Sequence, residues 1–183
     1  PIYNLQFYGL KPGQRVGVAG LGGLGHAAVK IALAWGCPVT VLSRGNAKRD
    51  LALSMGAGYL DVKDEAAVKD NAEGLDFIVD TIAADHDIEM YLSLLDVDGR
   101  LVLVGAPPHK LQILPFNIIG RRKSVSGSLI GGIQETQDML DFCGKHNIVL
   151  DIEMFKGSEI NEAYKKVEDA SVRFRAVIDT STF

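Results

Sequence analysis

Short apolar runs alternate with stretches in which apolar residues recur every three or four positions, as far as Gly105. The apolar runs predict five strands, over 15–19, 39–42, 59–62, 75–80 and 100–105. The periodic stretches predict helices over 24–35, 46–55 and 85–95, the second capped by Asn46, and a polar helical stretch follows the third strand. Short apolar strands that alternate with amphipathic helices indicate a parallel sheet covered on both faces.

The pattern changes after Gly105, where Pro107, Pro108 and Pro115 interrupt an apolar stretch. A sixth strand is predicted over 124–130 and a helix over 135–146, followed by short elements near 153–155, 160–167 and 175–179. Right-handed crossovers then favour an α/β fold, a doubly wound, Rossmann-type, six-stranded parallel sheet. We predict one domain over residues 1–183, with a C-terminal extension over 150–183 that folds back on it.

The glycine-rich stretch GLGGLG, residues 20–25, follows the first predicted strand and opens the first helix. In this context Gly20 permits a tight turn, Gly22 lets the backbone approach a pyrophosphate, and Gly25 lets helix pack on strand. The free N–H groups and the positive dipole of the helix N-terminus would then hold the anion. The stretch therefore predicts a dinucleotide-binding loop.

The end of the second predicted strand carries Ser43 and Arg44, with Lys48 one turn further on, and no acidic residue. An Asp or Glu there would bind the ribose 2′-OH and repel a 2′-phosphate. A hydroxyl and two cations instead suit a phosphate, so we expect NADP(H) as the cofactor.

The formal net charge of −4 makes a nucleic-acid partner or a membrane partner unexpected. The sequence shows no signal peptide and no apolar run long enough to span a bilayer. Two cysteines, far apart in the sequence, fit a reducing compartment, and we expect a cytoplasmic location.

Groups that could carry out catalysis are sparse. Tyr59 and Lys63 have the Tyr-xxx-Lys spacing of short-chain dehydrogenases, but they lie beside the third strand and the spacing is interpreted as coincidental. His26, at the start of the first helix, is open to a surface or capping role or to cofactor contact. The other histidines and the cysteines have no metal-ligand spacing. No catalytic residue and no metal site are predicted in this chain.

Several stretches resemble the cinnamyl-alcohol-dehydrogenase-like branch of the zinc-containing medium-chain alcohol dehydrogenases. They are GLGGLGHAAVK, YLSLLDVDGRLVLVG, RRKSVSGSLIGG, ETQDMLDFC and VRFRAVID, in the family's order. Family members carry an N-terminal catalytic lobe with a catalytic zinc and a four-cysteine structural zinc, whose ligands are not found in this sequence. The resemblance implies that this chain is the cofactor domain without that lobe, and that residues 1–14 are the hinge segment.

The resemblance also implies roles for individual residues. The loop 20–25 would hold the pyrophosphate, with the amides of Gly23 and Leu24 closest and Arg175 reaching it as well. Ser43, Arg44 and Lys48 would bind the 2′-phosphate. The remaining positions would line the adenosine side, namely Thr81 and Ile82, or meet the nicotinamide amide, namely Gly105, Ala106, Ser128, Leu129 and Ile130.

The implied activity is reversible hydride transfer between NADP(H) and an aldehyde or primary alcohol, with zinc in the catalytic lobe of the whole enzyme. A zinc-free quinone or enone reductase of the same superfamily and a non-catalytic NADPH-sensing module remain alternatives. The region 111–119, rich in apolar residues, is expected to pair two copies of the chain into a homodimer.

Overall fold

The computed structural model describes residues 7–169 and 171–183. It divides the chain into two compact units, one ending at Ile148 and the other covering Val149–Phe183. The predicted extension over 150–183 corresponds closely to the second unit. The prediction of one domain from 1 to 183 stays a prediction, as does its hinge segment over 1–14, of which residues 1–6 lie outside the described residues.

The first unit is built around one parallel sheet of six strands in the order β3-β2-β1-β4-β5-β6. Its strands are β1 (Val16–Ala19), β2 (Val39–Ser43), β3 (Gly58–Asp61), β4 (Leu75–Asp80), β5 (Leu95–Leu103) and β6 (Ser124–Gly127). All five pairings between neighbouring strands are parallel. The predicted fold class, a doubly wound six-stranded parallel sheet, is confirmed.

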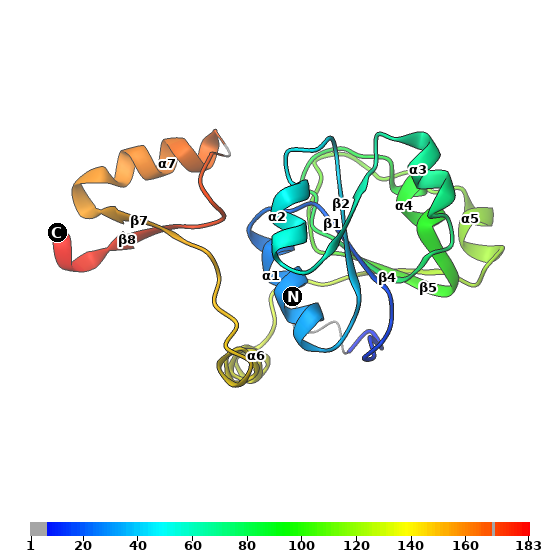
Figure 1. Ribbon diagram of the computed structural model, residues 1–183, viewed down its shortest axis with the longest axis horizontal. Coiled ribbons are helices and arrows are strands. Elements are labelled where there is room, and N and C mark those ends of the chain that lie inside the picture. Colours follow the sequence, from blue (N-terminus) through cyan, green and yellow to red (C-terminus); the bar gives the residue numbers. More distant parts are fainter. Residues whose placement is uncertain (1–6, 170) are drawn as a thin grey trace. The chain divides into compact units, whose positions relative to one another are not determined.

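Helices cover both faces of this sheet. They are α1 (Gly23–Ala34), α2 (Arg49–Ser54), α3 (Glu65–Asp70), α4 (Ile88–Leu94) and α5 (Pro115–Ile119). The last helix of this unit, α6 (Ile133–Lys145), follows β6 and has no buried residue. Figure 1 shows α1 and α2 on one side of the strands and α3, α4 and α5 on the other. This division follows from right-handed crossovers, because the chain winds outward from β1 to β3 and then returns to start again at β4.

The core lies between the sheet and these helices. Leu42, Ile78 and Leu101 come from three different strands, and Leu92 and Leu94 come from α4; all five are buried in one apolar cluster. Every helix in the described part of the chain is too short or too polar to cross a membrane.

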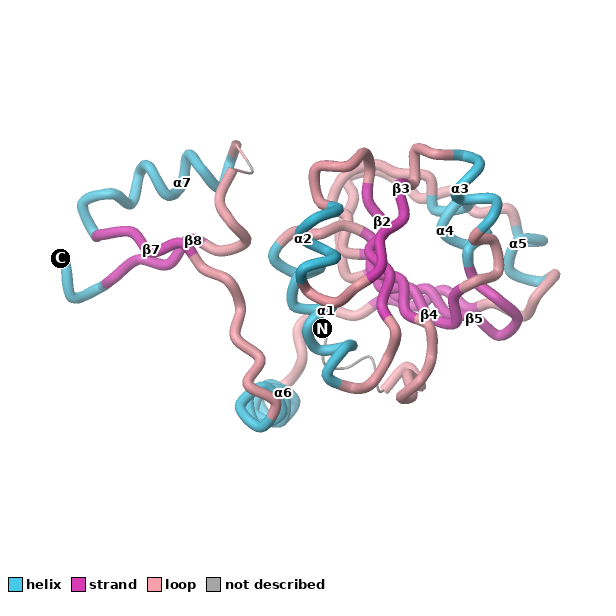
Figure 2. Tube along the Cα trace, in the orientation of Figure 1, coloured by secondary structure: helices cyan, strands magenta, loops and turns pink. Residues whose placement is uncertain are grey.

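The second unit contains β7 (Glu153–Lys156) and β8 (Ala176–Asp179), which pair in parallel, with η2 (Gly157–Glu159), α7 (Ile160–Glu168) and η3 (Thr180–Thr182). Figure 2 shows the two strands side by side, with α7 connecting them. Phe155 is buried, and the Lys166 ammonium lies over its ring and 2.5 Å from the Glu153 carboxylate.

Three expected elements differ from the structure. Asn46 does not cap α2, because a turn comes first: the Asn46 carbonyl accepts from the Arg49 amide, and Lys48 occupies the cap position. The fifth strand begins earlier, at Leu95, and its register with β4 shifts between Leu75 and Phe77. The sixth ends earlier, at Gly127, so that 128–130 form a loop.

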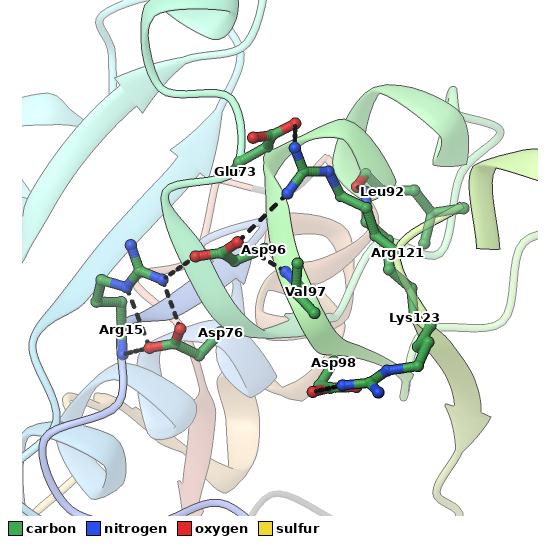
Figure 3. Close-up of polar contacts among 10 residues, drawn as sticks. Arg15, Glu73, Asp76, Leu92, Asp96, Val97, Asp98, Arg121 and Lys123 are labelled. Atoms are coloured by element: carbon green, nitrogen blue, oxygen red, sulfur yellow. Dashed lines mark hydrogen bonds and ion pairs between the residues drawn. The ribbon is translucent and has the colours of Figure 1, made fainter. Parts of the chain in front are cut away.

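An ion-pair network joins β1, β4 and β5 at their amino ends (Figure 3). The Arg15 guanidinium donates to Asp76 at 2.6 and 3.1 Å and to Asp96 at 3.0 Å. Arg121 lies between Asp96 and Glu73 (Figure 3), with contacts of 3.6 and 2.5 Å. The Arg15 guanidinium, by hydrogen bonding, holds the pKa of Asp76 below its usual range.

Replacing Arg15 by Met should lower the free energy of unfolding of the first unit by about 1–2 kcal/mol near neutral pH, allowing for solvent screening of a partly exposed pair. The pKa of Asp76 is depressed in the folded state, so the pair stabilises above the unfolded carboxyl value of about 3.9 and is lost as pH falls. Urea unfolding followed by Trp35, the single tryptophan, should show this difference shrinking below about pH 4.

Arg122→Met is the matched control. Arg122 pairs with Asp98 at 2.6 Å, but both side chains are more than half exposed, so little change is expected. A pH-independent loss for Arg15→Met, or an equal loss for both variants, would contradict the role given to the network.

Candidate functional site

The carboxyl ends of β1, β2, β4 and β5 meet at one edge of the sheet, where several of the predicted residues come together. The Gly20 amide donates to the Leu42 carbonyl of β2 at 3.0 Å, and the Thr81 amide donates to the Ala19 carbonyl of β1 at 3.0 Å. The Gly105 amide donates to the Asp80 carbonyl of β4 at 2.9 Å. The strand order reverses between β1 and β4, which is where open α/β sheets form a ligand crevice.

The glycine loop has the conformation that its sequence predicts. Gly20 has a φ of +84°, which L side chains rarely adopt, and this opens the turn after β1. A Cβ on Gly25 would lie 2.0 Å from the Gly20 carbonyl oxygen, so only glycine allows α1 to pack this closely. Gly22 is exposed, with no heavy atom within 4 Å of its Cβ position. The loop is therefore tight inside and open on its outer surface.

The N-terminus of α1 opens onto this loop. Gly22 is the N-cap residue, and Gly23 and Leu24 are the first two residues of the helix. No side chain caps the helix and no acidic residue lies in its first turn, within the described segment 20–26. The first N–H groups of a helix have no intrahelical partner, so this end offers donors and partial positive charge to an anion.

Thr81 and Ile82 pack against the glycine loop and against Gly105. The Thr81 hydroxyl donates to the Ala19 carbonyl at 2.8 Å, and it lies 3.2 Å from the Cβ position of Gly25. The Cβ position of Gly105 lies 2.2 Å from the Ile82 carbonyl oxygen. Four predicted segments, at Gly20–Gly25, Thr81, Ile82 and Gly105, thus form one contiguous surface.

The loop after β2 presents the predicted cations. Ser43 is the last residue of β2, and Arg44 and Lys48 are exposed beyond it. Arg49, the first residue of α2, adds a third exposed cation that the sequence reasoning did not single out. These positive charges would favour an anionic group here.

Two side chains of β3 hold this cationic loop, and neither was predicted to do so. The Asp61 carboxylate accepts from the Gly45 amide at 2.8 Å and from the Lys63 amide at 3.0 Å, and the Tyr59 hydroxyl donates to the Gly45 carbonyl. The Lys63 and Gly45 amides lower the pKa of Asp61. The Tyr59 hydroxyl is thus engaged by backbone, in keeping with the coincidental interpretation of its spacing to Lys63.

Asp80 and His86 form a second polar feature that the sequence reasoning missed. Asp80 ends β4 and is 1% exposed, and its Oδ2 lies 2.7 Å from His86 Nε2. Burial raises the pKa of Asp80, opposed by hydrogen bonds from the Ile82 amide and His86. Burial and Asp80 also raise the pKa of Tyr91 to about 12, whereas Arg44 acts to lower it. The sequence feature that could have revealed this pair is the carboxylate of Asp80 at the end of the predicted strand LDFIVD.

The remaining predicted residues follow β5 and β6 or belong to the second unit. Ser128, Leu129 and Ile130 follow β6 and line a cavity of about 220 Å³ with Phe7, Tyr8 and Glu135. Leu129, Ile130 and Ala106 are exposed. Arg175 lies in the second unit, immediately before β8, and its side chain is exposed.

His26 is 1% exposed, so the surface role left open by the sequence is wrong; it lies in a run of consecutive buried residues of α1, from Gly25 to Val29. Among residues 7–169 and 171–183, no group of three or more His, Cys, Asp or Glu side chains is placed to hold a metal ion.

Comparison with protein families and known proteins shows which family this chain belongs to. The family model of the zinc-binding dehydrogenases matches residues 23–145. A probable mannitol dehydrogenase of Medicago sativa is 46% identical over 184 residues, which cover 98% of this chain and 51% of that protein. The chain thus spans about half the length of this curated relative.

Solved structures of related enzymes also match nearly all of this chain and about half of their own length. A cinnamyl alcohol dehydrogenase of Sorghum bicolor aligns with a TM-score of 0.93 and 42% identity, covering 98% of this chain and 52% of that one. CAD from Helicobacter pylori, solved in complex with NADP(H), aligns with a TM-score of 0.84 and 44% identity, with the same coverage.

Proposed function

Because this chain belongs to the zinc-binding dehydrogenase family, we propose that it is the cofactor-binding half of an NADP-dependent alcohol dehydrogenase or aldehyde reductase. The observation that carries the proposal is the cationic loop after β2, which lies beside an open glycine loop and an uncapped helix N-terminus in the described residues. The relative solved with NADP(H) supports the choice of cofactor.

Each part of the surface receives one part of the nucleotide in this proposal. The loop 20–25, with the amides of Gly23 and Leu24, would hold the pyrophosphate. Ser43, Arg44 and Lys48 would bind the 2′-phosphate, and Thr81 and Ile82 would line the adenosine side. The remaining assignments are Gly105, Ala106, Ser128, Leu129 and Ile130 for the nicotinamide and Arg175 for the pyrophosphate.

The residues present fit NADP(H) but not zinc. The glycine loop leaves space for a phosphate above Gly22, and the exposed cations complement its charge. The described residues offer no cluster of metal-ligating side chains. When bound, NADP(H) supplies the hydride, and this chain binds and orients the nicotinamide. We propose that the group that polarises an aldehyde carbonyl belongs to an N-terminal catalytic lobe, as the partner of this chain.

A cytoplasmic location is also part of the proposal. Cys37 and Cys143 are both free thiols, Cys37 buried beside β2 and Cys143 on α6. Free thiols fit a reducing compartment.

The chain should bind NADP(H) more tightly than NAD(H). Arg44→Gln should weaken NADPH binding by about tenfold or more, through loss of a charge-assisted hydrogen bond, and should leave NADH binding nearly unchanged. Arg44→Asp should shift the preference further toward NADH. Dissociation constants for both nucleotides are measured by fluorescence titration at fixed salt.

Lys69→Gln is the matched control, because it removes one exposed positive charge from α3, outside the proposed site. Its NADPH affinity should equal that of the wild type. Equal affinities of the wild type for the two nucleotides would overturn the cofactor assignment, and an equal effect of both Gln variants would reduce the role of Arg44 to net charge.

The chain alone should bind NADPH and yet reduce no aldehyde above a no-protein control. A metal that stabilises developing charge by several kcal/mol raises the rate by orders of magnitude, since each ~1.4 kcal/mol is tenfold. The described residues include no cluster of side chains placed to hold such a metal. NADPH oxidation is followed with cinnamaldehyde and simple aldehydes in samples whose NADPH binding is verified. Zinc-independent turnover would place a catalytic group within this chain.

We also propose that the segment 111–119 pairs two copies of the chain. Leu111, Ile113 and Ile118 pack on the chain's own core, whereas Leu114, Phe116 and Ile119 are each more than 60% exposed. Half of this apolar segment is thus available to a partner.

Sedimentation should therefore show a dimer that Phe116→Glu dissociates. Burying a carboxylate in an apolar interface without a partner is unfavourable, which is the basis of the expected loss. Leu53→Glu, at an exposed apolar position of α2, should leave the dimer intact. A monomeric wild type at high concentration would contradict self-association.

A further inference from the structure

The loop between β4 and α4 is held by two titratable side chains that the proposed nucleotide contacts do not use. Asp80 Oδ1 accepts from the Ile82 amide at 3.0 Å, and Asp80 Oδ2 lies 2.7 Å from His86 Nε2. His86 Nδ1 lies 2.8 Å from the Ala84 carbonyl oxygen. The His86 side chain is only 9% exposed and Asp80 1%, so the contact between these two side chains is largely shielded from water.

The two ring nitrogens place His86 between a backbone carbonyl and a carboxylate. Nδ1 lies within hydrogen-bond distance of the Ala84 carbonyl oxygen and Nε2 within hydrogen-bond distance of Asp80 Oδ2, at 2.8 and 2.7 Å. The ring therefore links the loop at Ala84 to the end of β4 at Asp80.

The loop held in this way forms part of the surface described above. The Thr81 hydroxyl bonds the carbonyl at the end of β1, and the Ile82 carbonyl packs against the Cα of Gly105. The Asp80 carbonyl accepts from the amides of Val104 and Gly105. A change in the path of residues 81–86 would therefore displace both the glycine-loop side and the Gly105 side of the crevice.

Other charged groups face the pair from neighbouring elements. The Tyr91 ring of α4 lies edge-on to the His86 ring, with centroids 5.6 Å apart. Arg44, Asp80 and Asp87 all act on the Tyr91 hydroxyl. Asp85, on the outer side of the loop, pairs instead with His109 at 2.7 Å, where both side chains are exposed.

We propose that His86 is a positioning residue for nucleotide binding: the ring, in contact with Asp80 and with the Ala84 carbonyl, holds residues 81–86 in the form that receives the adenosine part of NADP(H). The inference rests on the proposed function. His86 acts through the loop and touches no reacting atom.

The test measures NADPH dissociation constants of the full chain at about pH 7 and constant ionic strength, above the second ionisation of a phosphate monoester near pH 6. His86→Leu removes both ring contacts and should weaken binding by about tenfold. His86→Gln places an amide donor near the Asp80 carboxylate, so it should recover most of that loss.

His109→Gln is the matched control, since it changes an exposed histidine after β5 that pairs with Asp85 of the same loop, and it should leave NADPH affinity unchanged. Urea unfolding of each variant establishes that the first unit is folded. Wild-type affinity in His86→Leu, or no recovery of affinity in His86→Gln, would overturn the proposal.

A nucleotide-free measurement separates this inference from the proposed function. Hydrogen exchange at the Ile82 amide, which bonds Asp80, should be faster in His86→Leu than in the wild type. Unchanged exchange would overturn the positioning role even if NADPH binds. A wild type that binds no NADPH would overturn the proposed function, and the nucleotide role of His86 with it, whatever the exchange result.

Discussion

The parallel pairing of β1 with both β2 and β4 is the constraint on which the rest of the first unit depends. β2 lies on one side of β1 and β4 lies on the other. The loops that follow β1 and β4 therefore start from neighbouring strand ends and run in opposite directions along the edge of the sheet. Backbone hydrogen bonds and the Thr81 hydroxyl then join these two connections across the top of β1. The place where these connections meet is a product of topology, and the glycine loop supplies the tight turn on the β1 side of it.

The two edges of the same sheet carry charge in different ways. At the amino edge, Arg15 and Arg121 are paired with Asp76, Asp96 and Glu73, which stabilises the fold with little positive charge left over. At the carboxyl edge, Arg44 extends into solvent beyond β2. Charge that is satisfied internally cannot recognise a ligand, so the amino edge serves stability and the carboxyl edge is available for binding.

Much of the fold could be predicted because strand and helix periodicities were strong and turn residues marked their ends. The strand 75–80 was predicted with its observed bounds, since the apolar residues of LDFIVD form one short run that begins directly after Gly74 and ends at Asp80. The fifth strand was placed too late because DVDG has the composition of a turn, and the structure accommodates it as a register shift after Leu95. In the sixth strand, Leu129 and Ile130 look like strand residues but lie exposed beyond the last pairing.

The residues of the candidate site also fall into those that the sequence could predict and those that it could not. Residues whose role depends on local backbone geometry, such as Gly20 and Gly25, were predictable from one stretch of sequence. Contacts between distant segments were not. Tyr59 and Asp61 reach Gly45 only because β3 pairs with β2, and His86 reaches Asp80 only because the loop folds back on the strand end.

The position of Asp61 explains how an acidic residue can lie beside a site proposed for a 2′-phosphate. In dinucleotide folds, an acid at the end of the second strand receives the ribose hydroxyl and repels a phosphate. Here Ser43 ends that strand, and the nearest acid is one strand further out, paired in register with it. The Asp61 Oδ1 accepts from the Gly45 and Lys63 amides, and these bonds keep its pKa low and its charge engaged with backbone dipoles. The carboxylate thus stabilises the turn that presents Arg44.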